Sequence, residues 1–243
     1  MNARGDAVEN RRLLEGKWAL VTGSSRGVGQ QIVKGLAGRK CNVVVHGRQP
    51  ENTDGTLELL KSSGVQVHRV SGDLSVPEGR QAVIDGVCAG PGHVDILYNN
   101  AGVMSEWKPI WEVEAGEWLD ILQVNLLAMI ALCNAFGPEM KRRGYGRIIN
   151  MSSGIKDTPN LSPYGVSKAA VDKYTMDLAT ELKDSNVLVN YLDPGWLKTD
   201  MGGKDAMYPV EDALPGALVP ALLEDNGPSG QRFAAQDFRM LTG

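Results

Sequence analysis

The sequence contains few of the residues from which metal and disulfide centres are built. Its 243 residues include three cysteines and three histidines. The cysteines form no C-x-x-C pair, and the histidines fit no H-E-x-x-H or similar ligand spacing. We therefore expect no metal site and no disulfide framework. The scarcity of cysteine favours a reducing compartment, the cytoplasm.

Long apolar runs and an excess of charge are also missing. The longest apolar stretch covers residues 126–133, far short of the roughly 18 residues that a membrane span needs. The polar first residues lack the apolar segment of a signal peptide. Lysine and arginine number 25 against 29 acidic residues, whereas nucleic-acid binding needs clustered positive charge. We expect a soluble protein with neither membrane nor nucleic acid among its partners.

Glycine, by contrast, is abundant. The chain has 29 glycines among 243 residues, well above the roughly 7% of average proteins. Glycine serves either in flexible linkers or where a backbone must turn tightly or approach a ligand closely. No linker long enough to divide the chain is present, so we expect a single domain, residues 1–243, with glycines at turns and ligand-facing loops.

Short β-branched runs alternate with longer helical patterns along the chain. We predict strands at residues 18–22, 42–46, 65–70, 94–98, 147–150, 187–192 and 231–234, and helices at 28–37, 57–62, 78–88, 117–136 and 167–183. The long fourth helix should end or bend at Gly137-Pro138. This alternation is typical of βαβ units with right-handed crossovers. It predicts a doubly wound, Rossmann-type α/β domain with a mostly parallel seven-stranded sheet and helices on both faces. Residues 199–230, rich in proline, are expected to form a substrate flap with a short helix between 211 and 223.

A glycine-rich loop, Thr22-Gly-Ser-Ser-Arg-Gly-Val-Gly29, follows the first predicted strand and opens the first helix. That context is the one a dinucleotide-binding loop requires. Gly23 permits the tight turn, Gly27 lets the backbone approach a pyrophosphate, and Gly29 allows close packing of helix and strand. The helix N-terminus adds free N–H groups and partial positive charge for the anion. A glycine turn that merely caps a helix is the alternative.

The end of the second predicted strand bears on the choice of cofactor. NAD sites usually place an acidic residue there to bind the ribose 2′-OH, whereas arginine accommodates the 2′-phosphate of NADP. Here the strand runs into Arg48, and the next carboxylate is Glu51. Arg26 in the glycine loop is a second cation that could clamp a phosphate. The sequence therefore favours NADP(H) over NAD(H), unless both arginines are ordinary surface residues.

A tyrosine and a lysine, Tyr164 and Lys168, are spaced to share one helix face. A lysine cation beside a phenol should lower the phenol pKa and suit it to acid–base catalysis. Ser152 and Ser153 follow the fifth predicted strand, at the sheet edge where doubly wound folds bind ligands. By itself, a tyrosine–lysine pair is equally consistent with an inert surface pair.

Taken together and in order, these motifs resemble the classical short-chain dehydrogenase/reductase family. The resemblance runs from about Gly16 to the end of the chain. It rests on the glycine loop, Asn99-Asn-Ala-Gly102, Asn125, Ser153, Tyr164-x-x-x-Lys168 and Pro194-Gly195. It implies a catalytic set of Asn125, Ser153, Tyr164 and Lys168. The tyrosine would be the acid–base, the lysine would lower its pKa and hold the nicotinamide ribose, the serine would orient the carbonyl, and the asparagine would organise a water. The family alignment selects Ser153, and Ser152 stays the alternative because the loop before Tyr164 is shorter than usual.

The same resemblance implies the residues that contact the cofactor. They are Gly23, Ser25, Arg26, Gly27, Val28, Gly29, Arg48, Asp73, Leu74, Asn100, Ala101, Gly102, Tyr164, Lys168, Pro194, Gly195, Trp196, Leu197 and Thr199. Asp73 would lie beside adenine, and Thr199 would meet the nicotinamide amide.

The implied activity is reversible hydride transfer between NADPH and a small carbonyl or alcohol substrate. We expect a carbonyl reductase that forms a homotetramer or a homodimer. The alternatives are a 3-oxoacyl-thioester reductase acting on acyl carrier protein, and a cofactor-sensing protein with little turnover. The substrate pocket is expected to be apolar or aromatic. Its candidate lining residues are Met104, Trp107, Trp111, Trp196, Met201, Met207 and Tyr208.

Overall fold

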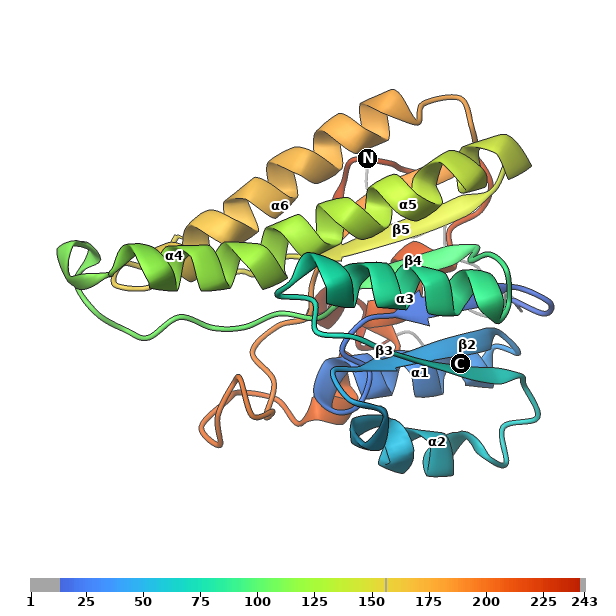
Figure 1. The fold of residues 1–243 in the computed structure, drawn as a ribbon, viewed down its shortest axis with the longest axis horizontal. Coiled ribbons are helices and arrows are strands. Elements are labelled where there is room, and N and C mark those ends of the chain that lie inside the picture. The colour runs from blue at the N-terminus through green and yellow to red at the C-terminus, as the bar shows by residue number, and fades with distance from the viewer. Residues whose placement is uncertain (1–13, 156, 241–243) are drawn as a thin grey trace.

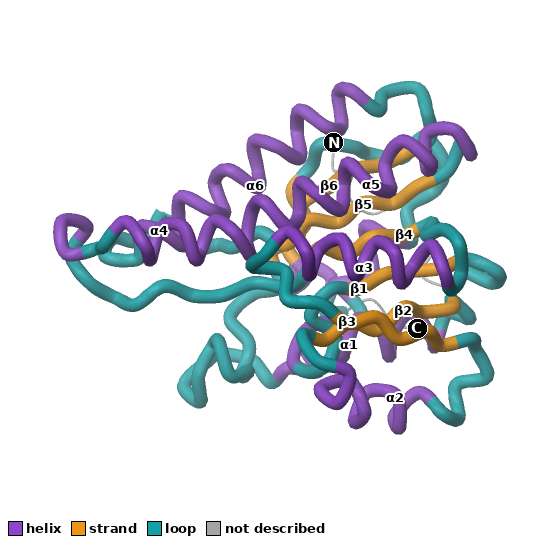
Figure 2. Tube along the Cα trace, in the orientation of Figure 1, coloured by secondary structure: helices purple, strands orange, loops and turns teal. Residues whose placement is uncertain are grey.

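The computed structural model describes residues 14–155 and 157–240. These residues form a seven-stranded sheet in the order β3-β2-β1-β4-β5-β6-β7, and every neighbouring pair is parallel (Figures 1 and 2). The strands are β1 Trp18–Val21, β2 Asn42–Gly47, β3 Val67–Ser71, β4 Ile96–Asn99, β5 Gly146–Met151, β6 Val187–Asp193 and β7 Arg232–Ala234. The helices are α1 Gly27–Gly38, α2 Asp54–Leu60, α3 Pro77–Ala89, α4 Ala115–Leu122, α5 Ala128–Arg143 and α6 Ser162–Glu181. The predicted doubly wound fold is confirmed.

Helices cover both faces of the sheet because the strands are apolar on both sides. In β1, Ala19 and Val21 belong to one hydrophobic core and Leu20 to the other. The first core includes buried residues of α1 and α2 and of the chain between 213 and 223. The second is built on α3, α5 and α6, which lie together across one face in Figure 1. Continuous apolar strands of this kind are typical of buried parallel sheets.

The long helix does not end at Gly137-Pro138, so the end predicted there is wrong. Helix α4 continues through a π-helical turn, Gln123–Leu127, into α5, which runs to Arg143. Pro138 lies on the exposed side of α5, as does Asn134, whose carbonyl loses its helical donor, so water can replace the missing bond. The helix ends at Gly144, whose φ of 68° gives a left-handed C-cap.

By length and composition, the continuous helix Ala115–Arg143 would also be able to cross a membrane. This differs from the expectation drawn from the short uninterrupted apolar run. In this structure its buried residues Leu132, Phe136 and Met140 pack into the second core, as expected for the core helix of a doubly wound domain.

Helix α6 begins at Ser162, five residues before its predicted start, with Pro163 in the first turn. Tyr164 therefore lies in the first helical turn. Part of the segment expected to be a flap, residues 199–230, belongs to the core. Residues 216–221 form a buried 3-10 helix, so this part packs into the core. The predicted short helix is a 3-10 helix, with Pro215 at its N-cap and Pro220 inside it.

The strand order reverses between β1 and β4, because the chain leaves β1 for α1 on one face and β4 for α4 on the other. Doubly wound folds bind ligands at this switch point, outside the carboxyl ends of the strands. The glycine loop follows β1, and Asn99 ends β4 with Asn100 directly after it. The fold thus brings the two motifs to the same edge of the sheet.

Candidate functional site

The glycine loop has a backbone that only glycine accommodates readily. Gly23 and Gly27 have φ values of 63° and 58°, in the left-handed region. A Cβ on Gly29 would lie 2.5 Å from the Gly23 carbonyl oxygen and 2.5 Å from the Asn100 side-chain nitrogen. The loop therefore packs closely on itself, and α1 starts at Gly27 with its N-terminus toward the sheet edge. The geometry fits a dinucleotide pyrophosphate, with backbone donors at a helix N-terminus.

Thr22 and Asn100 connect the loop to the end of β4. The Thr22 hydroxyl accepts hydrogen bonds from the backbone N–H groups of Asn100 and Ala101 at 2.9 and 3.0 Å. The Asn100 amide donates to the Thr22 carbonyl at 2.8 Å. Asn100 therefore acts here through its side chain, as a link between β1 and β4, while Ala101 packs against Gly23. Hydrogen bonds therefore hold the glycine loop and the end of β4 together beneath the predicted cofactor site.

The predicted phosphate-binding arginines are both accessible. Arg48 follows β2 and is exposed. Arg26 Nε lies 3.0 Å from an Asp200 carboxylate oxygen, with both side chains largely exposed. An exposed pair of this kind contributes little stability, so Arg26 is free to exchange its partner for a phosphate. Asp200 was not anticipated from the sequence.

Asp73 forms a turn at the end of β3. Its carboxylate accepts hydrogen bonds from the backbone N–H and the hydroxyl of Ser75, both of which lower its pKa, and the charge of Arg48 lowers it further. The charges of Arg48 and Asp73 therefore interact across the carboxyl ends of β2 and β3. Leu74, next in the chain, is buried in the second core.

Three of the four predicted catalytic side chains, Ser153, Tyr164 and Lys168, lie close together. The Ser153 hydroxyl, after β5, is hydrogen-bonded to the Tyr164 phenol in the first turn of α6. The Ser152 hydroxyl instead bonds the carboxylate of Asp172. The structure thus places Ser153 beside Tyr164 and directs Ser152 elsewhere, although the intervening loop is short. Lys168, four residues after Tyr164, is buried, and its Nζ donates to the Met151 carbonyl at 2.7 Å.

Burial dominates the electrostatics of both Tyr164 and Lys168 in this structure. Burial raises the pKa of Tyr164, the Ser153 hydrogen bond opposes that rise, and the charge of Asp193 adds to it. The Lys168 ammonium lies 5.6 Å from the centre of the Tyr164 ring. Burial also lowers the pKa of Lys168 to about 8, partly offset by Asp172. At neutral pH the tyrosine is therefore a protonated donor, and the lysine loses its proton only slightly above neutrality.

Asn125 lies in the π-helical turn and is buried. Its side chain accepts from the Val103 N–H at 2.8 Å and donates to the Val103 carbonyl at 2.9 Å and to the Ser167 hydroxyl at 3.0 Å. A Cβ on Gly102 would lie 3.3 Å from the Asn125 oxygen and 3.7 Å from Lys168 Nζ. Asn125 therefore fixes the loop after β4 beside Lys168. π-Helical turns of this kind are frequent at functional sites.

The segment after β6 completes the site. Gly195 has a φ of 86°, and its N–H donates to the Asp193 carboxylate at 3.0 Å. The other Asp193 oxygen accepts from Arg232 at 2.6 Å. Thr199 faces the glycine loop, because a Cβ on Gly27 would lie 3.5 Å from its methyl group. Asp193 was not predicted from the sequence, and its place at the carboxyl end of a predicted strand was the available signal.

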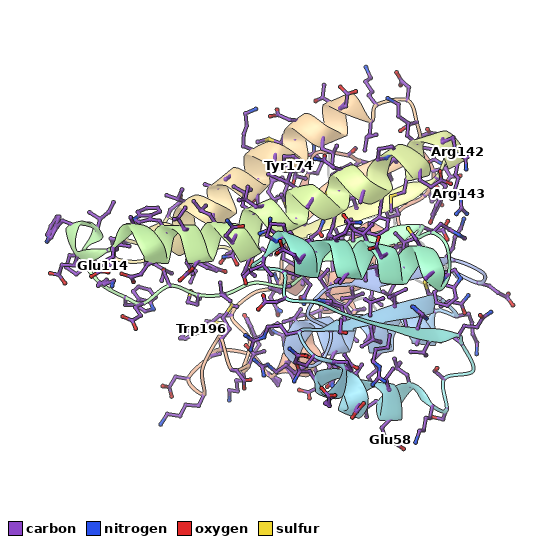
Figure 3. The ribbon with its side chains drawn as sticks, viewed as in Figure 1. Glu58, Glu114, Arg142, Arg143, Tyr174 and Trp196 are labelled. Carbon is purple, nitrogen blue, oxygen red and sulfur yellow. The ribbon has the colours of Figure 1, made fainter. Side chains whose placement is uncertain are left out.

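The large apolar residues expected to line a pocket are dispersed. Trp107, Trp111, Trp196, Met201 and Met207 are all exposed. Glu114, three residues after Trp111, lies at the far tip of α4, well away from Trp196 on the loop after β6 (Figure 3).

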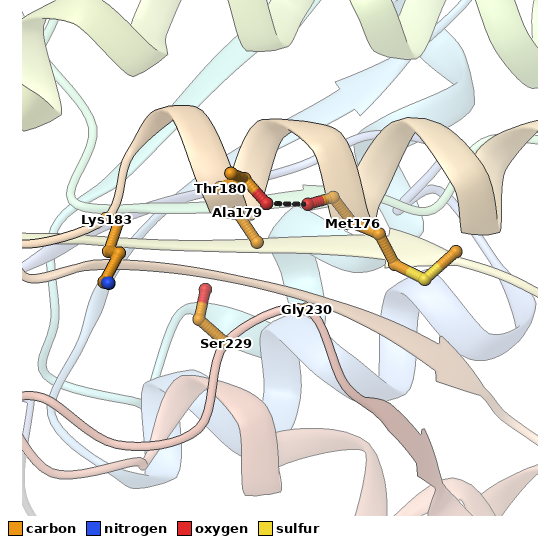
Figure 4. Close-up of a pocket in the computed structure, with 6 residues that line it drawn as sticks. All are labelled: Met176, Ala179, Thr180, Lys183, Ser229 and Gly230. Carbon is orange, nitrogen blue, oxygen red and sulfur yellow. Dashed lines mark hydrogen bonds between the residues drawn. The ribbon is translucent and has the colours of Figure 1, made fainter.

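A hollow of about 360 Å³ lies elsewhere on the molecule. It is lined by Met176, Ala179, Thr180, Lys183, Ser229 and Gly230 (Figure 4). It adjoins the C-terminal half of α6, whereas Tyr164 and Lys168 are in the N-terminal half. This hollow is therefore separate from the candidate site.

The comparisons with known proteins agree with this geometry. The family model described as short chain dehydrogenase matches residues 17–207. Dehydrogenase/reductase SDR family member 4 of Sus scrofa is 38% identical over 195 residues, which cover 79% of this chain and 70% of the relative. Gluconate 5-dehydrogenase of Gluconobacter oxydans is 35% identical over 193 residues, 77% of this chain and 74% of the relative.

A solved structure gives the same result for the fold. The 3-oxoacyl (acyl-carrier-protein) reductase of Agrobacterium tumefaciens, with NADP bound, superposes with a TM-score of 0.83 at 26% identity. The match covers 96% of this chain and 98% of that one. The chain therefore belongs to the short-chain dehydrogenase family and is an oxidoreductase that uses a nicotinamide cofactor.

Proposed function

We propose that this protein is an NADP(H)-dependent carbonyl reductase that interconverts a small ketone or aldehyde and its alcohol. The observation that carries the proposal is the contact of Ser153 with a buried, protonated Tyr164 beside the buried Lys168. These groups lie at the same sheet edge as the glycine loop. When bound there, the nicotinamide supplies the hydride, and the protein supplies orientation and the proton.

Each side chain has a part in moving the proton. As charge grows on the carbonyl oxygen during reduction, the Ser153 and Tyr164 hydroxyls stabilise it by donating hydrogen bonds, an effect worth several kcal/mol in related sites. Tyr164 then gives up its proton, for which its raised pKa holds it ready at neutral pH. Lys168 is the adjacent cation and, with a pKa of about 8, can release a proton near neutrality. Asn125 keeps the neighbouring loop in place through Val103.

The preference for NADP(H) is part of the proposal. Arg48 is exposed at the end of β2, where an NAD-specific site would carry an acid. Arg26 is held only by the exposed Asp200, so both guanidinium groups are available for a 2′-phosphate. Comparable kcat/KM values for NADPH and NADH would refute this preference.

The test is the loss of NADPH absorbance against ketones, aldehydes, diketones and a 3-oxoacyl thioester, with gluconate and NADP+ for the reverse direction. Turnover of a carbonyl in the first three groups supports the proposal, and activity confined to the thioester supports the acyl reductase. Tyr164→Phe should abolish turnover while NADPH still binds. Retention of more than a tenth of the wild-type rate would contradict the role of Tyr164. Binding of NADPH without turnover on any substrate would favour a sensor.

We also propose an apolar substrate and an oligomeric, cytoplasmic enzyme. Trp196, Met201 and Met207 offer apolar surface beside the cofactor edge. Leu119 on α4 and Met176 on α6 are exposed on the long helices that cover one face of the sheet, and exposed apolar surface of this kind favours association. A gel-filtration mass near that of the 26.2 kDa monomer would refute the tetramer or dimer.

A further inference from the structure

A buried histidine connects the glycine loop with the end of β3. His46 is near the carboxyl end of β2, which lies between β1 and β3 in the sheet. The residue is 2% exposed. His46 has no role in the proposed reaction, and it fits no metal-ligand spacing.

Both ring nitrogens of His46 have partners whose roles are fixed. The N–H of Gly23 donates to Nδ1 at 2.9 Å. Nε2 lies 3.1 Å from the Gly72 carbonyl oxygen. A backbone N–H only donates and a carbonyl only accepts, so Nδ1 must be bare and Nε2 must carry the proton. The neutral Nε2–H tautomer therefore satisfies both contacts. In a doubly protonated ring, the Nδ1–H would face the Gly23 N–H, and that hydrogen bond would be lost.

The partners of His46 belong to the two ends of the proposed cofactor site. Gly23 is the first glycine of the loop, and Gly72 directly precedes Asp73. The backbone of His46 also bonds the loop, because its N–H donates to the Ser24 hydroxyl at 2.9 Å and its carbonyl accepts from the Ser24 N–H at 3.1 Å. His46 thus determines where the loop sits relative to the end of β3.

We infer that His46 is a positioning residue for the cofactor loop, that its neutral ring holds Gly23 in the binding geometry, and that its protonation weakens dinucleotide binding. This inference rests on the proposed function, in that the glycine loop is taken to hold NADP(H). No atom of His46 needs to touch the cofactor.

The surroundings of the ring favour the neutral form. Burial is the main influence and lowers the pKa of His46 below its ordinary value. The Gly72 hydrogen bond and the negative charge of Asp73, after β3, act in the opposite direction. Arg48, two residues further along the same strand end, acts on the same Asp73 carboxylate. On the loop side the nearby charged residue is Arg26, which is exposed and paired with Asp200.

Two amide substitutions separate the two bonds. In His46→Asn, the side-chain oxygen stands where Nδ1 stands and can accept from Gly23, but it has no ionisable group. In His46→Gln, the longer side chain brings its amide to Gly72 and leaves Gly23 without an acceptor. His68→Asn is the matched control, because Nε2 of His68 also contacts a backbone carbonyl, that of Gly86 at 3.0 Å, away from the loop.

The experiment measures the Kd of NADP+ by calorimetry from pH 8 down to the lowest pH at which each variant stays folded, because burial lowers the pKa of His46; the melting temperature of each variant is measured alongside. We expect His46→Gln to bind on the order of tenfold more weakly at pH 8, as loss of one well-placed hydrogen bond implies. His46→Asn should bind within about threefold of wild type at pH 8 and lose less affinity than wild type in acid. The His68→Asn variant should follow wild type throughout. The 2′-phosphate of the ligand titrates equally in every case, so it cancels from the comparison at each pH.

The inference is overturned if His46→Gln binds as tightly as wild type, or if His46→Asn loses affinity in acid as steeply as wild type. If His46→Gln fails to fold, the pH series of His46→Asn alone decides. Failure of the proposed function looks different: the wild-type protein would then bind neither NADP+ nor NAD+ at any pH.

Discussion

Replacing Gly29 by alanine tests the close packing of the glycine loop. The new Cβ would lie 2.5 Å from the Gly23 carbonyl oxygen, and ordinary contact begins at 3.4 Å. The loop must therefore move by 3.4 minus 2.5, about 0.9 Å, because the obstacle is backbone rather than a flexible side chain. Overpacking of this kind costs roughly 1–3 kcal/mol. At 2–4 °C per kcal/mol for a chain of this length, the melting temperature should fall by roughly 2–12 °C.

The same shift should weaken cofactor binding, because misplacement by about 1 Å can cost on the order of 10²-fold in a positioned site. The assay is the Kd of NADPH by fluorescence, together with thermal unfolding. Gly38→Ala is the matched control: it lies at the end of the same helix, and its Cβ would have no neighbour within 4 Å. We expect that variant to bind NADPH like wild type and to be equally or more stable. If Gly29→Ala matches Gly38→Ala in both measurements, the reasoning about the loop is refuted.

Three further predictions concern the serines, the cofactor phosphate and the buried cation. Ser153→Ala should lower kcat on the order of 10²-fold because it removes a donor to the carbonyl oxygen, whereas Ser152→Ala should lower it less than tenfold; the reverse order in steady-state assays would make Ser152 the catalytic serine. Arg48→Glu should raise the KM of NADPH by at least tenfold through charge repulsion and leave that of NADH much less affected, and equal changes for both cofactors would contradict the 2′-phosphate contact. The folded-state pKa of Lys168, about 8, lies below its ordinary 10.5, so the buried cation costs stability below pH 8 and that cost disappears as the pH rises toward 10.5. Lys168→Met should therefore be more stable than wild type in urea at pH 7, with a smaller difference at pH 10, and a difference that grows with pH would show the opposite sign.

The sequence predicted the parts of the site that depend on local pattern. Gly23, Gly27 and Gly29 follow a strand at a spacing that the structure confirms as a tightly packed loop. The four-residue spacing of Tyr164 and Lys168 placed both on one helix face, and α6 includes both. Periodicity and turn chemistry carry this information because they act over a few residues.

The remaining features depend on partners that are distant in the sequence. The pKa of Tyr164 rises because the fold buries it, and burial cannot be read from the spacing to Lys168. Ser152 bonds Asp172, 20 residues away, a contact that separates it from Ser153 and that the spacing does not reveal. His46 bonds groups 23 and 26 residues away. Pro138 failed as a helix terminator because its position on the exposed side of α5 follows from the tertiary packing.

The π-helical turn between α4 and α5 has a consequence for how one helix serves two neighbours. Successive residues of an α-helix are separated by about 100° around its axis, so one additional residue in a turn rotates everything beyond it by that angle. Helix α5 directs Leu132 and Met140 to the sheet, while α4 packs on α6. The inserted residue changes the angle around the helix axis between the face of α4 that packs on α6 and the face of α5 that packs on the sheet. It also turns Asn125 inward at the junction. Deleting one residue from 123–127 would remove this change of angle. Either the core face of α5 or the contact of α4 with α6 would then be rotated out of place.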